Sequence, residues 1–400
     1  MKRIWKIIIA VAVIAAVSLW VKSRWRAWFR NVPEVEYAAA LTPDRITLTP
    51  GADFGSERTV SWRCGDAVAT SSLLLAHHGD TLSVEAAGTA VKSRGGTDAF
   101  YCAHLSGLKS GETYSYCVVT AGKASRWYSF SMPEASSKHR FIYFGDVQDT
   151  IGGQSHEWFA KLYRNFADAD FWACAGDLIE APVDVYWNYL YQSTDSILAS
   201  MPIVNAAGNH DYIKSLYLTI DPRWAKTFVY PDNGARTAKG KSYFFDTPSM
   251  RFIVLDTNGV QDIISAMGET LWLDKVLQDA GNKWKIVMMH HPIYSVRKGR
   301  NNYVIRNAFR PLLEKHGAHL VLQGHEHGYM RTQAESGKPV YIVSFMSPKA
   351  YVARHADTGM KIVPGTRTYQ VIDFDDSTLR FSSFALDDDS PVDSITITRQ

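Results

Sequence analysis

The sequence predicts an α/β fold preceded by a small all-β sandwich domain. From residue 136 to residue 400, apolar runs typical of buried strands alternate with amphipathic stretches typical of helices, which indicates strands joined by crossover helices. Between residues 33 and 133, short alternating strands are separated by turns rich in Gly, Asp and Ser, the pattern of a β-sandwich. With 400 residues, of which 46% are hydrophobic and 21% charged, the chain has enough material for both domains.

Residues 1–30 form a separate segment that is predicted to be a signal anchor or a signal peptide. A positively charged stretch, Met1–Lys6, precedes the uncharged run 7–21, whose length suits a signal sequence or a short membrane anchor. We favour an uncleaved anchor because no small-residue cleavage site follows the run. Positive residues on both flanks leave the orientation open. We therefore expect an exported catalytic domain, periplasmic or extracellular, that is membrane-anchored or secreted.

The charge and the cysteines add two expectations. The net charge of +3 is small and much of the positive charge lies in the first thirty residues, so no nucleic-acid partner is expected.

Strand alternation places Cys64 toward the sandwich core and Cys102 and Cys117 outward, which favours a Cys102–Cys117 disulfide. Cys174 lies within an apolar strand and is expected to be a buried thiol.

Individual elements follow from the same patterns. Strands are predicted at 58–62 and 113–119 in the sandwich, and at 368–374, 379–384 and 394–398 in the C-terminal tail. Helices are predicted at 155–166, 186–198, 270–280 and 304–316.

Five apolar runs end in residue types that bind metals. They lead into Gly145-Asp146-Val147-Gln148, Gly176-Asp177-Leu178-Ile179-Glu180, Gly208-Asn209-His210-Asp211, His290-His291 and Gly324-His325-Glu326-His327. Oxygen and imidazole ligands at successive strand ends suit a dinuclear site for hard or borderline cations, in which one carboxylate bridges the two ions.

This ordered set of blocks resembles the calcineurin-like metallophosphoesterases, and the flanking stretches 242–246, 251–257 and 324–331 are similar to the purple acid phosphatase branch. The resemblance covers roughly residues 40 to 400. It implies a four-layer α/β/β/α sandwich for the catalytic domain, whose second sheet we expect the C-terminal strands to complete. Residues 105–114 are similar to part of the fibronectin-III-type domain that precedes the catalytic domain in plant-like purple acid phosphatases. We expect the sandwich domain of this chain to act as a spacer and as a packing partner of the catalytic domain.

The resemblance also implies a ligand set. Asp146 and His327 would bind the first metal, Asp177 would bridge, and Asn209, His290 and His325 would bind the second. The spacing of His325 and His327 supports this set, because alternate residues of an extended segment face the same side.

Further residues are candidates for contact with the substrate. His210 would touch the substrate or leaving group, and Asp211 would hold its imidazole tautomer. On the loop 295–302, Arg297 and Arg300 are candidates for a phosphate clamp, with a solvated basic loop as the alternative. His291 is expected beside the ligands, as a hydrogen-bonded neighbour or a substrate contact.

Two positions depart from the family pattern. Purple acid phosphatases carry in the second block a Tyr whose phenolate binds ferric iron, and Glu180 stands there instead. The wider superfamily places a His where this chain has Gln148. Either residue could complete the first metal site, and we favour Gln148. Such oxygen-rich ligation favours Mn²⁺, Zn²⁺ or Fe²⁺ over a purple ferric centre.

These features predict a metal-dependent hydrolase of phosphate esters, an acid phosphatase-like phosphomonoesterase that uses two divalent metal ions and a metal-activated water. Its expected partners are a small-molecule phosphate ester and, through the N-terminal segment, a membrane. The alternative is a phosphodiesterase or nucleotide pyrophosphatase with the same metal site. A catalytically silent binding protein is disfavoured because the bridging residue, Asp177, is present.

Overall fold

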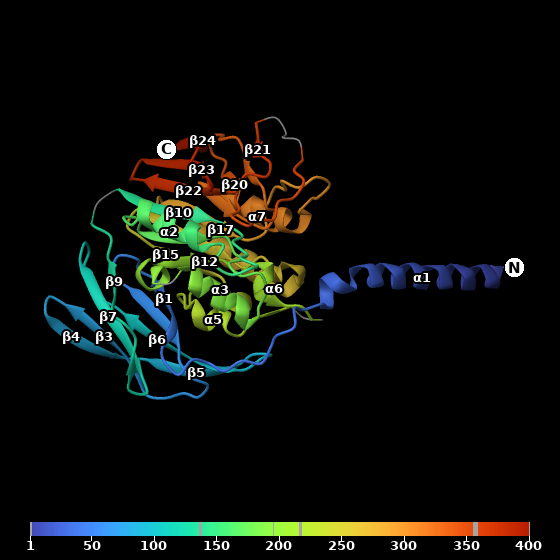
Figure 1. The fold of residues 1–400 in the computed structure, drawn as a ribbon. Helices are drawn as coiled ribbons and strands as arrows, with labels where there is room; N and C mark the ends of the chain where they lie inside the picture. The colour runs from blue at the N-terminus through green and yellow to red at the C-terminus, as the bar shows by residue number, and fades with distance from the viewer. Residues whose placement is uncertain (1, 136–137, 195, 216–217, 355–358, 400) are drawn as a thin grey trace.

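The computed structural model describes residues 2–399 except for 136–137, 195, 216–217 and 355–358. The chain begins with one long helix, α1 (Lys2–Phe29), which projects away from the rest of the protein (Figure 1). Within it, Ile4–Ser23 is long and apolar enough to cross a membrane, and none of this segment is buried in the protein. A signal sequence near the N-terminus would have the same properties.

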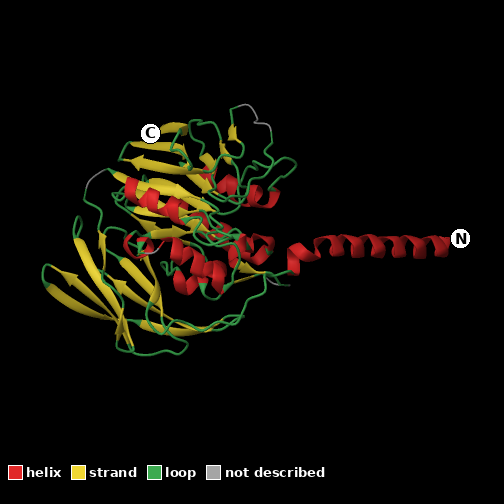
Figure 2. Cartoon of the chain, in the orientation of Figure 1, coloured by secondary structure: helices red, strands yellow, loops and turns green. Residues whose placement is uncertain are grey.

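An all-β sandwich follows, as predicted, and Figure 2 shows this strand-only region beside the larger helix-containing body. One sheet has the order β1-β2-β6-β5, and the other has the order β4-β3-β7-β8 with β9 paired to β7. The strands are β1 (Asp44–Pro50), β2 (Arg58–Arg63), β3 (Ser71–His77), β4 (Asp80–Glu85), β5 (Ala87–Lys92), β6 (Thr97–Leu105), β7 (Thr113–Thr120), β8 (Lys123–Ala124) and β9 (Tyr128–Ser131). Large apolar side chains from both sheets, including Trp62, Tyr101 and Tyr116, fill the space between them.

The predicted Cys102–Cys117 disulfide is wrong, since all four cysteines are free thiols. Cys64 lies in the sandwich core and Cys174 is buried, as expected. Cys102 lies on β6 and Cys117 on β7, which belong to different sheets. Two residues that point outward from opposite sheets of a sandwich face away from each other, so strand alternation alone could not identify a pair.

The larger body contains two mixed sheets packed face to face. The first has the order β12-β11-β10-β22-β23-β24 and the second the order β15-β16-β17-β18-β20-β19-β21. Aromatic side chains meet between them, for example Phe141 against Phe252 and Phe171 against Phe245. The strands of the first sheet are β10 (His139–Phe144), β11 (Phe171–Cys174), β12 (Ile203–Asn205), β22 (Thr368–Phe374), β23 (Thr378–Ala385) and β24 (Pro391–Thr398). Those of the second are β15 (Tyr243–Asp246), β16 (Met250–Leu255), β17 (Trp284–Met289), β18 (Leu320–Gln323), β19 (Tyr329–Arg331), β20 (Val340–Val343) and β21 (Lys361–Val363).

Helices cover the outer face of each sheet, which completes the expected four layers. The helices α2 (His156–Asn165) and α3 (Asp184–Thr194) contribute buried residues to the core of the first sheet. The helices α6 (Ile263–Asp279) and α7 (Tyr303–Lys315) pack on the second sheet through Leu273, Leu277, Phe309 and Leu313. The predicted helix 270–280 starts earlier than expected, because the Asp262 carboxylate accepts a hydrogen bond from the Ser265 amide and caps the N-terminus.

Short elements connect these layers. They are α4 (Ile197–Ser200), η1 (Asn209–Asp211), β13 (Tyr212–Ile213), β14 (Thr219–Ile220), α5 (Trp224–Thr227), η2 (Arg236–Ala238) and η3 (Gly259–Gln261).

The C-terminal strands exist as predicted and complete one of the two sheets, although the sequence did not identify which one. β22 pairs antiparallel with β10, so β22, β23 and β24 extend the first sheet. Sequence pattern identifies such strands by alternation but carries no information on which edge they join.

Candidate metal centre

The candidate ligands come together where parallel strands of both sheets end. β10, β11 and β12 run parallel in one sheet, and β16, β17, β18 and β20 run parallel in the other. Ligands in α/β proteins gather at such carboxyl ends. The backbone there is unusual: positive φ angles between 45° and 72° occur at Asp146, Gln148, Asp177, His325 and His327. Left-handed non-glycine residues are uncommon and concentrate at functional sites.

Two glycines make room for the carboxylates. A Cβ atom on Gly208 would lie 2.0 Å from Oδ1 of Asp177, and one on Gly324 would lie 2.7 Å from Oδ2 of Asp146. Any larger residue would displace a candidate ligand, so the Gly in both blocks is a steric requirement of the site.

One side of the site is formed by His290 and its neighbours. Its Nδ1 contacts the carbonyl oxygen of Ala175 at 2.7 Å, which directs Nε2 into the site. That Nε2 lies 3.3 Å from Oδ2 of Asp177, 3.0 Å from Oδ1 of Asn209 and 3.2 Å from Nδ1 of His325. These four side chains therefore converge on a space in which all could bind one cation.

The other side is formed by Asp146, Gln148 and His327. The Nδ1 atom of His327 contacts the carbonyl oxygen of Lys349 at 3.0 Å, and its Nε2 lies 3.9 Å from Oδ1 of Asp146. Asp146 and Gln148 are fully buried. Oδ1 of Asp146 and both polar atoms of the Gln148 side chain make no hydrogen bond within the described chain.

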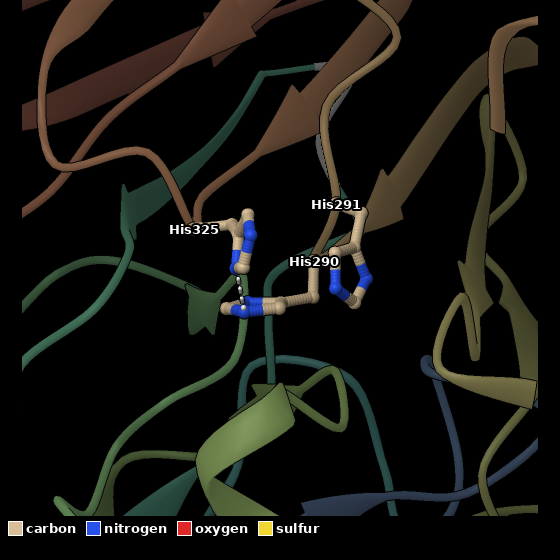
Figure 3. A group of neighbouring side chains, drawn as sticks. All are labelled: His290, His291 and His325. Carbon is tan, nitrogen blue, oxygen red and sulfur yellow. Dashed lines mark hydrogen bonds between the residues drawn. The ribbon is translucent and has the colours of Figure 1, made fainter. Parts of the chain in front are cut away.

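Figure 3 shows the histidine cluster on the His290 side of the site. The imidazoles of His290 and His325 approach each other. His291 directly follows His290 in the chain, and its ring lies beside theirs. The ring nitrogens of all three lie within 4.8 Å of one another. Nδ1 of His291 contacts the Thr257 hydroxyl at 2.9 Å, so this residue is anchored by a hydrogen bond beside the candidate ligands.

The protonation states suit cation binding. Burial opposes charge on Asp177, but His290 and His210 hold the pKa of this carboxyl below its ordinary value. Burial and neighbouring histidines lower the pKa of His325, and burial lowers the pKa of His327 to about 4. Ionised carboxylate and neutral imidazole are the forms that bind metals.

Two further groups have pKa values raised above their ordinary ranges. Burial raises the pKa of Asp146 well above its ordinary value. Burial would lower the pKa of His290, but Asp177 and Asp146 raise it to about 9. A cation at this site would therefore displace protons as it binds.

Of the two alternatives for the first site, Glu180 already has a partner. Its carboxylate forms an ion pair with Nζ of Lys349, at 2.6 and 2.8 Å from its two oxygens. Lys349 follows β20, where the apolar run 340–346 leads into Ser347-Pro348-Lys349. This sixth strand end was missed because it carries no residue type that binds metals, although its apolar run is a detectable signal. The geometry favours Gln148, whose side-chain amide has no hydrogen-bond partner among the described residues, over Glu180.

The expected role of Asp211 needs correction. Nδ1 of His210 contacts the carbonyl oxygen of Glu180, not the carboxylate of Asp211. Asp211 instead accepts a hydrogen bond from the Gly208 amide at 2.7 Å and closes the turn. The carboxylate folds back onto its own backbone, as Asp commonly does in turns. His210 is part-exposed, with Nε2 4.0 Å from Oδ2 of Asp177.

The loop 295–302 borders the site and is held by a buried residue that sequence reasoning overlooked. Glu326 accepts hydrogen bonds from the Ser295 hydroxyl and from the amides of Val296 and Arg297. The Arg297 guanidinium lies 3.9 Å from the centre of the Tyr351 ring, which in turn lies 4.7 Å from the His327 ring. Arg300 is exposed, with Nε 3.9 Å from Oε1 of Glu326.

Comparison with known proteins agrees with this architecture. Residues 43–132 match the purple acid phosphatase N-terminal domain, and residues 139–329 match the calcineurin-like phosphoesterase family. Tartrate-resistant acid phosphatase type 5 of rabbit (Oryctolagus cuniculus) is 26% identical over 42% of this chain and 56% of its own length. Purple acid phosphatase 15 of Arabidopsis thaliana is 24% identical over 46% of this chain and 37% of its own length.

The alignments thus span about half or less of the length of these relatives. Among solved structures, a purple acid phosphatase from yellow lupin (Lupinus luteus) seeds superposes with a TM-score of 0.74 at 18% identity, covering 90% of this chain and 75% of the lupin chain. That similarity extends over the sandwich and the two-sheet body together. The chain therefore contains a calcineurin-like phosphoesterase domain, which a purple acid phosphatase N-terminal domain precedes.

Proposed function

We propose that this chain is a metal-dependent hydrolase of phosphate esters, of the phosphomonoesterase class. The observation that carries the proposal is a pair of buried oxygen atoms without hydrogen-bond partners in the described chain: Oδ1 of Asp146 and Oε1 of Gln148. Leaving such atoms unpaired is unfavourable by about 1–3 kcal/mol for each group. Their concentration at one strand-end cluster is explained if cations satisfy them.

The residues present fit a pair of divalent cations. Asp146, Gln148 and His327 would hold one, Asn209, His290 and His325 the other, and Asp177 lies between the two sets. Two bound cations supply a nucleophilic water at neutral pH and positive charge for the phosphoryl oxygens. All donors are oxygen or imidazole nitrogen, which favours Mn²⁺, Zn²⁺ or Fe²⁺.

His210 is the candidate proton donor to the leaving group. The carbonyl of Glu180 engages its Nδ1, so Nε2 is the atom left to face a substrate. The carboxylates of Asp177 and Glu180 lie 4.0 and 3.9 Å from its ring nitrogens. Its backbone amide also donates to Oδ1 of Asp177 at 2.8 Å, which fixes the residue relative to the metal site.

Two arginines remain candidates for holding the phosphate. Arg297 is fixed in place by Tyr351 and by the Glu326 contact to its amide. Arg300 is exposed and can reorient. A guanidinium beside a phosphate oxygen provides paired hydrogen bonds.

We propose that the apolar helix α1 holds the protein at a membrane as a signal anchor, with the hydrolase outside the cytoplasm. The length and exposure of Ile4–Ser23 support the anchoring.

The test is an activity panel on the full chain supplied with Mn²⁺, Zn²⁺ or Fe²⁺. Aryl monophosphates, bis-aryl phosphodiesters and nucleotides would be compared by kcat/KM. We expect the monoester to be preferred. Preference for the diester or the nucleotide would replace the phosphomonoesterase assignment with a phosphodiesterase or pyrophosphatase, and no hydrolysis of any ester would refute the proposal.

A further inference from the structure

Exposed apolar side chains lie on segments that follow strands of the candidate metal centre. We call the following residues, each at least 58% exposed, the apolar rim: Ile151, Ile263, Ile264, Met267, Val304 and Val352. Single exposed apolar residues are ordinary on soluble proteins, but a group around one site marks an interaction surface.

The topology places the rim at the end of the molecule where the ligands lie. Ile151 follows Asp146 and Gln148 in the segment after β10. Ile263, Ile264 and Met267 lie in the first turns of α6, which follows β16, and Val304 lies in the first turn of α7, which follows β17 and His290. Since the carboxyl ends of parallel strands meet at one edge, these positions lie at the same edge as the candidate ligands.

The last member of the rim is joined to the site through direct contacts. Val352 follows Tyr351, whose ring lies against His327, and the carbonyl oxygen of Val352 accepts a hydrogen bond from the Lys298 amide. Lys298 and Arg300 are exposed there, so positive charge lies beside the apolar side chains.

The helix α1 leaves the protein at this same end. Just after it, Asn31 exchanges two hydrogen bonds with the backbone of Lys214, at 2.7 and 2.8 Å. Lys214 directly follows β13, which follows the turn carrying Asn209, His210 and Asp211. Figure 1 shows α1 projecting on the side of the body where α6 and α7 lie.

A buried ion pair keeps this connection rigid. Oε1 of Glu34 lies 2.6 Å from Nη1 of Arg223, and both side chains are 1% exposed. Nη2 of Arg223 also pairs with Asp221 at 2.7 Å, and the Asp221 amide donates to the carbonyl of Asp211. The end of α1 is therefore tied to the turn that holds the candidate proton donor.

Apolar side chains interspersed with basic ones, next to a membrane-spanning segment, form the combination that binds bilayer surfaces. We infer that the apolar rim rests on the membrane that holds α1, and that the metal centre acts on the phosphate monoester of a lipid headgroup in that membrane. This substrate class rests on the proposed function.

The experiment uses the full chain, α1 included, reconstituted with divalent metal in phosphatidylcholine vesicles. One assay supplies phosphatidic acid in the same vesicles, and a second supplies a soluble aryl monophosphate. The rim variant combines Ile263→Ser, Ile264→Ser and Met267→Ser, none of which is a candidate ligand or substrate contact. The matched control is Leu82→Ser, an apolar residue that is 62% exposed on the sandwich strand β4.

We expect the rim variant to lose roughly ten-fold or more in kcat/KM toward phosphatidic acid and to keep its activity toward the aryl ester, because each lost apolar contact weakens interfacial binding. The control should keep both activities. Unchanged hydrolysis of phosphatidic acid by the rim variant, or equal losses on both substrates, would overturn the inference. So would a change in oligomeric state of the rim variant in sedimentation, which would make the rim a contact between copies of the chain.

The same assays separate this inference from the proposed function. If the wild-type protein hydrolyses the aryl ester but not phosphatidic acid, the lipid assignment fails and the phosphomonoesterase assignment stands. If it hydrolyses neither ester with metal supplied, the proposed function itself fails.

Discussion

Replacing Gln148 by Met should stabilise the metal-free protein and weaken its metal binding. Gln148 is fully buried, and neither its amide nitrogen nor its amide oxygen has a hydrogen-bond partner in the described chain. A buried amide left unpaired is unfavourable by about 1–3 kcal/mol. Met has a similar length and no strong polar group, and it adapts to irregular spaces. We therefore expect Gln148→Met to raise the free energy of unfolding of the chelator-treated protein by about 1–3 kcal/mol.

In the metal-loaded protein the same substitution should be unfavourable. There the amide oxygen would be a ligand, so the variant should bind less metal at the first site, seen as a lower stoichiometry by elemental analysis. Urea unfolding of both proteins, with and without chelator, gives the two effects in one experiment. A loss of stability in the chelator-treated variant would refute the reasoning, because Gln148 would then have a partner in the protein. Unchanged metal content would indicate that Glu180, and not Gln148, completes the first metal site.

Three further predictions concern His210, Glu269 and the pair formed by Glu180 and Lys349. His210→Ala should lower kcat by about 10² to 10⁴ with both metals retained, since the residue acts on the leaving group; loss of a metal would instead make it a ligand. Burial raises the pKa of Glu269 to about 8 from 4.5. Between these two pH values the folded state holds a proton that the unfolded state releases. The free energy of unfolding is therefore highest below about pH 4.5 and falls by up to about 5 kcal/mol as the pH rises through 8. Glu269→Gln should flatten this decline in urea unfolding between pH 5 and 8, and an unchanged slope would contradict the burial argument. Because Glu180 pairs with Lys349 where purple acid phosphatases carry Tyr, the metal-loaded protein should be colourless, and a persistent visible absorption band would contradict that ligation.

Much of the site could be predicted because its residues lie at strand ends. A strand is recognised by its apolar run, and the residue that follows a buried parallel strand must emerge at the edge of the sheet. By that rule the sequence predicts that Asp146, Asp177 and His290 lie together, and in the structure their ligand atoms lie within 4.8 Å of one another.

Contacts that depend on side-chain direction could not be predicted in this way. Whether Asp211 contacts His210 or closes its own turn depends on local backbone angles. In the structure its carboxylate accepts a hydrogen bond from the Gly208 amide and closes the turn. The pairing of Lys349 with Glu180 joins segments far apart in the sequence. The sheet joined by the C-terminal strands and the absence of a disulfide between Cys102 and Cys117 depend in the same way on three-dimensional arrangement.

The central claim is that a metal pair held by Asp177 and its neighbours is required for ester hydrolysis. The most direct measurement is metal content against aryl phosphatase activity, for the wild-type chain and for Asp177→Asn, during chelation and stepwise return of divalent metal. The account predicts that activity disappears with the metal and returns as about two equivalents per chain are bound. The variant should bind less metal and stay nearly inactive. Full activity in a wild-type preparation shown to be free of metal would contradict the account.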